Sequence, residues 1–180
     1  MTGSAADIAE LRERIERLEG AQTSDRLSLC VFSGELDKII AAFVIATGAA
    51  ASGMDVKMFF TFWGTAALRD AKKRADKSLV GKMFGWMLPR GTRKLKLSKM
   101  QLLGMGRAMI RSIMKKQGVA SVEELIEIAA ELEVQILVCT MSMELMEIKR
   151  EELIDYPNLD FVGVASFVEL AADSRSTLFI

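Results

Sequence analysis

The chain alternates short apolar runs with longer amphipathic or apolar stretches. Compact runs rich in β-branched and aromatic residues predict strands, and the longer stretches predict helices between them. The predicted strands cover residues 27–32, 56–62, 134–139, 160–165 and 177–180, the last at a sheet edge. The predicted helices cover residues 35–52, 98–116, 121–132 and 142–148, with short ones at 151–153 and from 166.

Three serines support the predicted helix starts. Each stands three residues before a glutamate or glutamine, the spacing of a capping box. They are Ser98 before Gln101, Ser121 before Glu124 and Ser166 before Glu169.

Strands separated by helices favour parallel pairing with right-handed crossovers. We therefore expect a three-layer α/β/α fold with a mostly parallel sheet of about five strands, over residues 27–180. Residues 69–98 interrupt the alternation and read as an irregular, basic, methionine-rich insertion. Gly104, Met105 and Gly106 do not form a dinucleotide fingerprint, because they lie inside a predicted helix and follow no strand.

The first residues carry a separate helical pattern. Ile8, Leu11, Ile15 and Leu18 recur at intervals of three, four and three, which predicts a short amphipathic helix within residues 1–20. Residues 21–26 read as a linker. Two heptads are marginal alone, so we expect this helix to pack on another copy of the chain or on the domain.

Composition excludes several chemistries. The chain has no histidine, which rules out Ser-His-Asp and Cys-His couples and histidine-ligated metals. Its two cysteines cannot build a four-thiolate zinc site or a disulfide framework, and they fit a reducing cytoplasm. Acids at positions 7, 10 and 13 interrupt a signal peptide, and the longest apolar run, residues 39–51, is too short to span a membrane. We expect no metal and no cofactor.

Charge is unevenly distributed although the formal net charge is zero. Residues 69–116 carry 15 of the 24 lysines and arginines but only two acids, Asp70 and Asp76. This pattern favours a basic surface for an anionic ligand, an acidic partner or a membrane face, and a solvated lysine-rich face is the plain alternative. Nucleic acid is not expected, since no stacking motif or recognition helix accompanies the charge.

Cys139 is the candidate nucleophile. It ends a predicted strand just before a helix, and in an α/β sheet ligands bind beyond the carboxyl ends of the strands. Backbone N–H groups at a helix start favour a thiolate and a lowered pKa. The alternative is a buried thiol that acts as a small hydrophobe. Candidate supporting residues at the same rim are Ser33, Gly34, Asp37, Lys38, Trp63, Gly64, Thr140 and Ser142.

The remaining candidates have plain alternatives. Cys30 is a possible second thiol, but its position within a strand favours packing in the core. Asp37 and Lys38 either orient a ligand or form a surface ion pair. Trp63 either covers a thiol pocket or belongs to the core.

Several segments together resemble the DsrE/DsrF-like sulfur-relay family, and in particular its branch called peroxiredoxin-like. The most specific are Phe-Phe-Thr-Phe-Trp-Gly at 59–64 and Cys-Thr-Met-Ser-Met at 139–143. Phe-Ser-Gly-Glu-Leu-Asp-Lys at 32–38, the helix at 41–50, and residues 99–106 extend the likeness over most of residues 27–180.

The resemblance implies a parallel α/β sheet, homo-oligomers, and a cysteine, matched here by Cys139, that carries sulfane sulfur. It also implies rhodanese-like and TusA-like protein partners. We therefore expect a cytoplasmic sulfur carrier or sulfurtransferase that reacts with anionic sulfur compounds. The alternative hypothesis is a non-catalytic oligomeric module that binds an anionic ligand or a membrane-peripheral partner through the basic segment.

Overall fold

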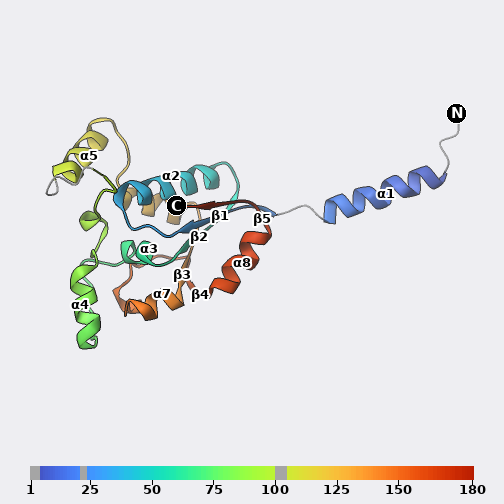
Figure 1. The fold of residues 1–180 in the computed structure, drawn as a ribbon. Helices are drawn as coiled ribbons and strands as arrows, with labels where there is room; N and C mark the ends of the chain where they lie inside the picture. Colours follow the sequence, from blue (N-terminus) through green and yellow to red (C-terminus); the bar gives the residue numbers. More distant parts are fainter. Residues whose placement is uncertain (1–4, 21–23, 100–104) are drawn as a thin grey trace.

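Five parallel strands form the centre of the protein, in the order β4-β3-β2-β1-β5. The computed structural model describes residues 5–20, 24–99 and 105–180. Helices cover both faces of the sheet (Figure 1), which confirms the predicted three-layer α/β/α fold. The strands are β1 Ser24–Val31, β2 Asp55–Phe60, β3 Gln135–Cys139, β4 Leu159–Val162 and β5 Ser174–Phe179.

The two faces of the sheet are covered unequally. Helices α2 (Leu36–Ala51) and α6 (Val122–Glu131) pack on one face, over the large core cluster. Helix α8 (Val164–Ala172) packs on the other face. The remaining helices lie around the carboxyl ends or in the insertion, and two are short 3₁₀ turns. They are α3 Trp63–Ala67, α4 Leu79–Met87, η1 Thr92–Lys94, α5 Met105–Lys116, α7 Thr140–Leu145 and η3 Arg150–Glu152.

Alternation along the strands divides the core into two clusters. Successive strand residues point to opposite faces, so Leu29 and Val31 join the large cluster under α2 while Cys30 points toward α8. The small cluster on the α8 side consists of Cys30, Phe59, Leu137, Cys139 and Phe167. Both cysteines therefore lie on the thinly covered face.

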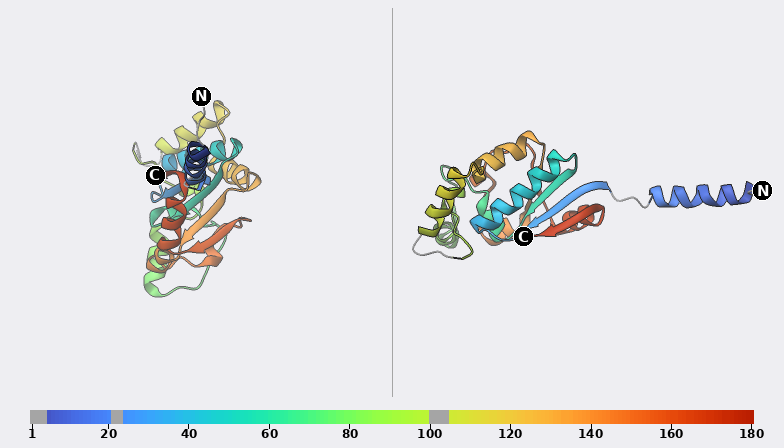
Figure 2. Two further views of the ribbon diagram at one scale, coloured as in Figure 1. Left: turned by 90° about the vertical axis from the view of Figure 1, so that its right-hand side faces the viewer. Right: turned by 90° about the horizontal axis from the view of Figure 1, so that it is seen from above.

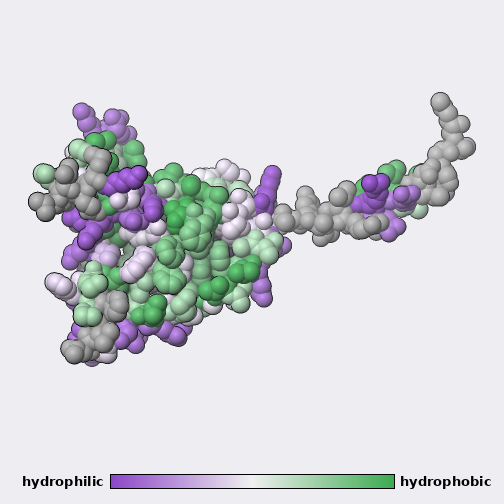
Figure 3. Space-filling view, in the orientation of Figure 1, coloured by the Kyte–Doolittle hydropathy of each residue, from purple (hydrophilic) through white to green (hydrophobic). Residues whose placement is uncertain are grey.

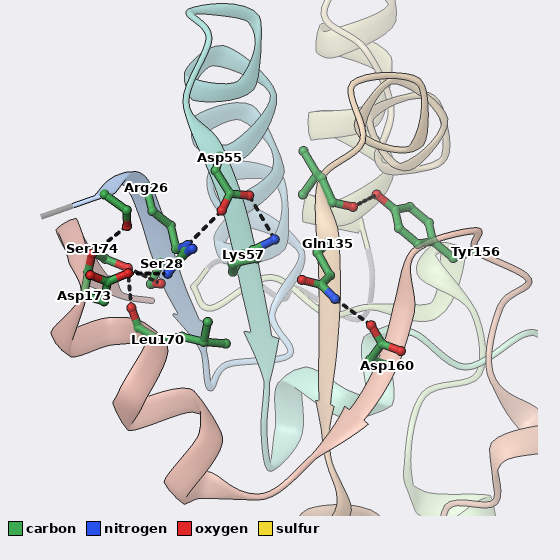
Figure 4. A network of polar contacts seen from close by, with 12 residues as sticks. Arg26, Ser28, Asp55, Lys57, Gln135, Tyr156, Asp160, Leu170, Asp173 and Ser174 are labelled. Atoms are coloured by element: carbon green, nitrogen blue, oxygen red, sulfur yellow. Dashed lines mark hydrogen bonds and ion pairs between the residues drawn. The ribbon is translucent and has the colours of Figure 1, made fainter.

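Polar contacts fix the amino ends of the strands (Figure 4). Arg26 of β1 binds Asp55 of β2 at 2.8 Å and Asp173, just before β5, at 3.1 Å. The Ser28 and Ser174 hydroxyls lie 2.8 Å apart in a hydrogen bond between β1 and β5. These contacts tie three neighbouring strands together at the end of the sheet opposite the predicted site.

Of the three predicted helix caps, one is confirmed, one differs from the structure, and one lies partly outside the described residues. Ser121 and Glu124 form the predicted capping box at the start of α6. Ser166 is not a cap, because β4 ends at Val162 and Gly163, in extended conformation, is the N-cap of α8. Gln101 lies outside the described residues, and Ser98 instead donates to the Asp37 carboxylate from its backbone N–H and its hydroxyl.

The basic insertion is more ordered than its sequence predicts. We expected irregular structure because Gly81, Gly85, Pro89 and Gly91 punctuate this segment, yet α4 runs through the first two glycines. A Cβ at Gly81 would collide with the Glu147 side chain. The glycines therefore permit close packing of α4 rather than breaking it, which sequence patterning alone cannot distinguish.

One buried carboxylate anchors this insertion to the domain. Glu152 accepts from the Arg69 guanidinium at 3.0 Å and forms an ion pair with Lys77. All three side chains are at most 2% exposed. Backbone pairing of Arg69 with Leu153 adds to the contact. Charges this deeply buried depend on their partners, because unpaired they carry a large desolvation cost.

Helix α1 (Ala5–Gly20) lies apart from the sheet (Figure 2). Ile8, Leu11 and Ile15, three residues of its predicted seam, are exposed. The apolar seam of α1 therefore does not pack against the sheet domain of the same chain. Among the described residues, no helix combines the length and the hydrophobicity that a membrane crossing requires.

Replacing Glu152 should test the anchor. We predict that Glu152→Gln lowers the free energy of unfolding by about 3 kcal/mol, since it leaves Arg69 and Lys77 buried without a counter-charge. Urea denaturation measures the loss. The matched control is Asp155→Asn, whose carboxylate pairs with Lys73 at 2.6 Å but is 92% exposed, so it should change stability little. Equal effects of the two substitutions would contradict the anchor.

The difference in unfolding free energy between wild type and Glu152→Gln also depends on pH. Burial would raise the pKa of Glu152, but hydrogen bonds from Lys77, the Lys149 backbone and Arg69 bring it below its ordinary value. A depressed folded-state pKa stabilises the protein above the unfolded pKa, and this stabilisation is lost as pH falls through the folded value. The stability difference between wild type and Glu152→Gln should therefore shrink below about pH 4.

Candidate functional site

Cys139 occupies the carboxyl end of β3, where the sequence placed it. It is the N-cap residue of α7 and pairs in register with Val162 of β4. Its side chain is fully buried, within the small cluster under α8. Within the same cluster, the rings of Phe59 and Phe167 stack with centroids 4.5 Å apart. The thiol is therefore closed to solvent in this conformation, and any reagent requires a movement of the cover.

Cys30 belongs to the same cluster but is not adjacent to Cys139. Cys30 pairs with Phe59 of β2, and Phe59 pairs with Leu137 of β3, two residues before Cys139. Standard sheet spacings then separate the two cysteine Cα atoms by about 12 Å, too far for a disulfide without backbone movement. Burial, and then the nearby Cys139, raise the pKa of Cys30 to about 11. Cys30 is thus a poor nucleophile at neutral pH in this fold.

Ser142 holds the segment that follows Cys139. Its hydroxyl is fully buried, lies 2.9 Å from the Thr61 hydroxyl and accepts from the Phe62 backbone N–H at 2.9 Å. Phe62 has a positive φ of 44°, a conformation that costs free energy for a bulky residue. The hydroxyl therefore joins α7 to the strained turn that ends β2, and so fixes the backbone beside Cys139.

Three other predicted residues form local contacts at the carboxyl ends. Thr140 donates to the Val162 carbonyl at 3.4 Å, which connects the ends of β3 and β4. Lys38 donates to the Ser33 hydroxyl at 3.1 Å and forms an ion pair with Glu35 at the same distance. Lys38 therefore does form a surface ion pair, but its partner is Glu35 and not Asp37, with which we had expected it to pair.

Asp37 binds the chain instead of facing a ligand. Its carboxylate accepts from the Ser98 backbone N–H at 2.9 Å and from the Ser98 hydroxyl at 2.5 Å. Burial would raise the pKa of Asp37, but the bonds from Ser98 bring it below its ordinary value. Asp37 thus ties the end of the insertion to the start of α2.

Gly34 and Gly64 allow two backbones to approach closely. A Cβ on Gly34 would lie 2.5 Å from the Trp63 carbonyl oxygen, and one on Gly64 would overlap the Val31 carbonyl. The Gly64 N–H donates to the Phe32 carbonyl at 2.9 Å. Both positions require glycine because the β1–α2 loop rests directly on α3.

A large cavity separates the predicted residues into two groups. Its volume is about 1100 Å³, and Ser33, Gly34, Lys38 and Trp63 line it. Its described lining does not include Cys139, Thr140, Ser142, Asp37 or Gly64. The predicted residues all lie at or just after the carboxyl ends of β1, β2 and β3, as expected, but they form two sites, a closed thiol under α8 and an open cavity beside α4. Six further cavity residues were not predicted individually from the sequence. They come from the basic stretch at 69–116, whose uneven charge was the signal that could have found them: Arg74, Lys82, Arg90, Lys94, Lys96 and Arg107.

Removal of the Ser142 hydroxyl should loosen the backbone at Cys139. We predict that Ser142→Ala lowers the free energy of unfolding by about 1–3 kcal/mol, because the part-buried Phe62 N–H and the buried Thr61 hydroxyl lose their partner. Thermal or urea denaturation measures this loss. Thr140→Val is the control, since its long 3.4 Å bond contributes little. A Ser142→Ala protein as stable as wild type would show that the hydroxyl does not fix this turn.

Comparison with known proteins identifies the family of this chain. Residues 23–179 match the model of the DsrE/DsrF/DrsH-like family. The uncharacterized protein YrkE of Bacillus subtilis is 42% identical over 160 residues, which cover 88% of this chain and 99% of that protein. The sulfur carrier protein DsrE2 of Allochromatium vinosum is 35% identical over 159 residues, covering 86% and 98% of the two chains.

A solved structure supports the fold independently. The crystal structure of the ychN protein from E. coli superposes with a TM-score of 0.50 at 9% identity, over 86% of this chain and 98% of that one. At this identity the likeness concerns the fold alone. Sequence and structure agree, and the chain belongs to the DsrE/DsrF/DrsH-like family.

Proposed function

We propose that the protein is a sulfur carrier, which holds sulfane sulfur on Cys139 as a persulfide or thiosulfonate and passes it to a partner protein. Family membership and 35% identity to a sulfur carrier protein support a sulfur-relay role. The observation that carries the assignment to Cys139 is its position at the carboxyl end of an interior strand, as the N-cap of α7. Cys30, with a pKa raised to about 11, is the poorer candidate.

Loading requires no cofactor and no oxidant other than the sulfur donor itself. The Cys139 thiolate attacks one sulfur of a polysulfide, and a new S–S bond forms while the neighbouring S–S bond of the polysulfide breaks. The electron pair leaves with the shortened polysulfide, and Cys139 carries a persulfide. With tetrathionate the same attack leaves a thiosulfonate on Cys139 and releases thiosulfate. In both reactions the thiolate is the reactive form.

Access to the thiol requires local opening of its cover. Within α8, Phe167 is the buried side chain, whereas Val164 and Val168 are exposed. Truncating a buried phenylalanine to alanine costs about 3–5 kcal/mol, and we take the free energy of exposing Phe167 to be of the same order. An opening of that size leaves roughly one molecule in a hundred to one in several thousand open at any time. That population allows reaction while it protects the carried sulfur between encounters.

Delivery would occur on the same face. The partner's thiolate attacks the outer sulfur of the persulfide, and the electron pair of the broken S–S bond returns to the Cys139 sulfur. Met141 and Leu145 of α7 and Val164 and Val168 of α8 are exposed near the thiol, and they offer an apolar surface for a protein partner. A TusA-like or rhodanese-like thiol protein fits this requirement.

Mass spectrometry of the intact, folded protein tests the proposal. After incubation with sodium polysulfide, wild type should gain the mass of one or more sulfur atoms, and dithiothreitol should remove it. Cys139→Ser should lose the adduct, and the matched control Cys30→Ser should retain it. An adduct that persists in Cys139→Ser, or no adduct on any protein with polysulfide or tetrathionate, would reject Cys139 as the carrier.

A further inference from the structure

The cavity beside α4 has no role in the chemistry at Cys139. Phe32, Ser33 and Gly34, at the carboxyl end of β1, and Trp63 of α3 form one side. Helix α4 and residues 87–96 form the other side. Figure 1 shows α4 and α5 beyond the carboxyl ends of the strands, at the left of the view. The cavity therefore lies where α/β proteins usually bind small molecules.

Its lining is strongly cationic. Seven lysines and arginines line the cavity against one acid, Glu35. Glu35 already pairs with Lys38, and within the described part of the chain the other six form no ion pair. They are Arg74, Lys82, Arg90, Lys94, Lys96 and Arg107. In the space-filling view, hydrophilic residues gather at the left, between α5 and the sheet (Figure 3). Within the described residues, about six positive charges at the cavity have no acidic partner. This charge favours an anionic ligand.

Three cationic side chains converge next to Gly85 of α4. A Cβ at this glycine would lie 3.2 Å from a terminal nitrogen of Arg90, 3.8 Å from one of Arg69 and 3.9 Å from the Lys77 ammonium. Glu152 is the carboxylate bound to Arg69 and Lys77, and the fully buried Nε of Arg69 has no hydrogen-bond partner. Burial, and then repulsion by Arg69 and Arg74, lower the pKa of Arg90. An anion in the cavity would relieve this repulsion.

Apolar side chains complete the lining. Trp63 and Trp86 both face the cavity, with Met87, Leu88 and Pro89 beside them. Trp86 is 86% exposed, an unusual position for a large aromatic residue without a partner. A volume of about 1100 Å³ far exceeds what thiosulfate or inorganic phosphate needs and lies just above the usual range for pockets that bind organic ligands.

We propose that this cavity binds an organic polyanion of nucleotide size, with two or more phosphate-type groups and an aromatic or apolar body. Arginines and lysines bind the phosphate oxygens through charge-assisted hydrogen bonds, and the tryptophans contact the body. The cations line a half-open cavity, together with two tryptophans, instead of a flat face, which favours a small molecule over a membrane surface. The site is separate from Cys139, so the inference does not depend on sulfur transfer.

Tryptophan fluorescence reports on this site directly, because the two tryptophans of the chain both line the cavity. Titration of the full-length protein with ATP, excited where adenine does not absorb, should change the fluorescence saturably. Pyrophosphate should compete with ATP, and uncharged adenosine should bind much more weakly. Higher salt should weaken the binding, since the interaction is largely ionic.

Charge variants locate the anion. Arg90→Gln and Lys94→Gln should each weaken ATP binding by about tenfold, the loss of one charge-assisted contact. Lys115→Gln is the matched control, because Lys115 lies on the basic helix α5 but lines a different cavity. It should bind as wild type does. Calorimetry repeats the comparison without relying on the tryptophans, and circular dichroism confirms that each variant is folded.

Three outcomes would overturn the proposal. They are no saturable signal with ATP or pyrophosphate up to millimolar concentration, an equal loss in Lys115→Gln, and a response to vesicles of anionic phospholipid alone. The last would assign the surface to a membrane. Cys139→Ser should bind ATP normally, so failure of sulfur loading and failure of anion binding can be told apart.

Discussion

The shared carboxylate of Glu152 is the interaction on which the functional end of the molecule depends. Arg69 and Lys77 are buried with it, at the point where the basic insertion leaves the domain. Because two cations share one carboxylate, the anchor keeps a net positive charge under α4, next to Arg90. This contact therefore holds the insertion over the carboxyl ends of the strands, while the lysines and arginines that line the cavity give it its cationic character.

The unequal covering of the sheet explains how the fold combines rigidity with access. The α2–α6 side has a large core, and polar bonds at the amino ends fix the strands. On the α8 side, Cys139 belongs to a small cluster, and Phe167 of α8 covers this cluster. This arrangement suits the proposed carrier, in which the scaffold would stay fixed while a modest local opening exposes the thiol.

Much of the fold was predictable from the sequence, because strand periodicity and the Ser121–Glu124 capping box are local signals. Helix α4 was not, since Gly81 and Gly85 look like breakers until their close neighbours, Glu147 and Arg90, are known. The position of Cys139 at a strand end was also predictable. Two other features depend on strand order and on which way each side chain points. Cys139 is buried, and Ser33, Lys38 and Trp63 line a cavity that does not include it.

A crystal structure of polysulfide-treated protein would show most directly whether Cys139 carries the sulfur. We predict electron density for an additional sulfur atom bonded to the Cys139 sulfur, with α8 or Phe167 shifted to accommodate it, and an unmodified Cys30. An unmodified Cys139 beneath an unmoved α8, in crystals of protein whose mass shows added sulfur, would mean that Cys139 is not the carrier.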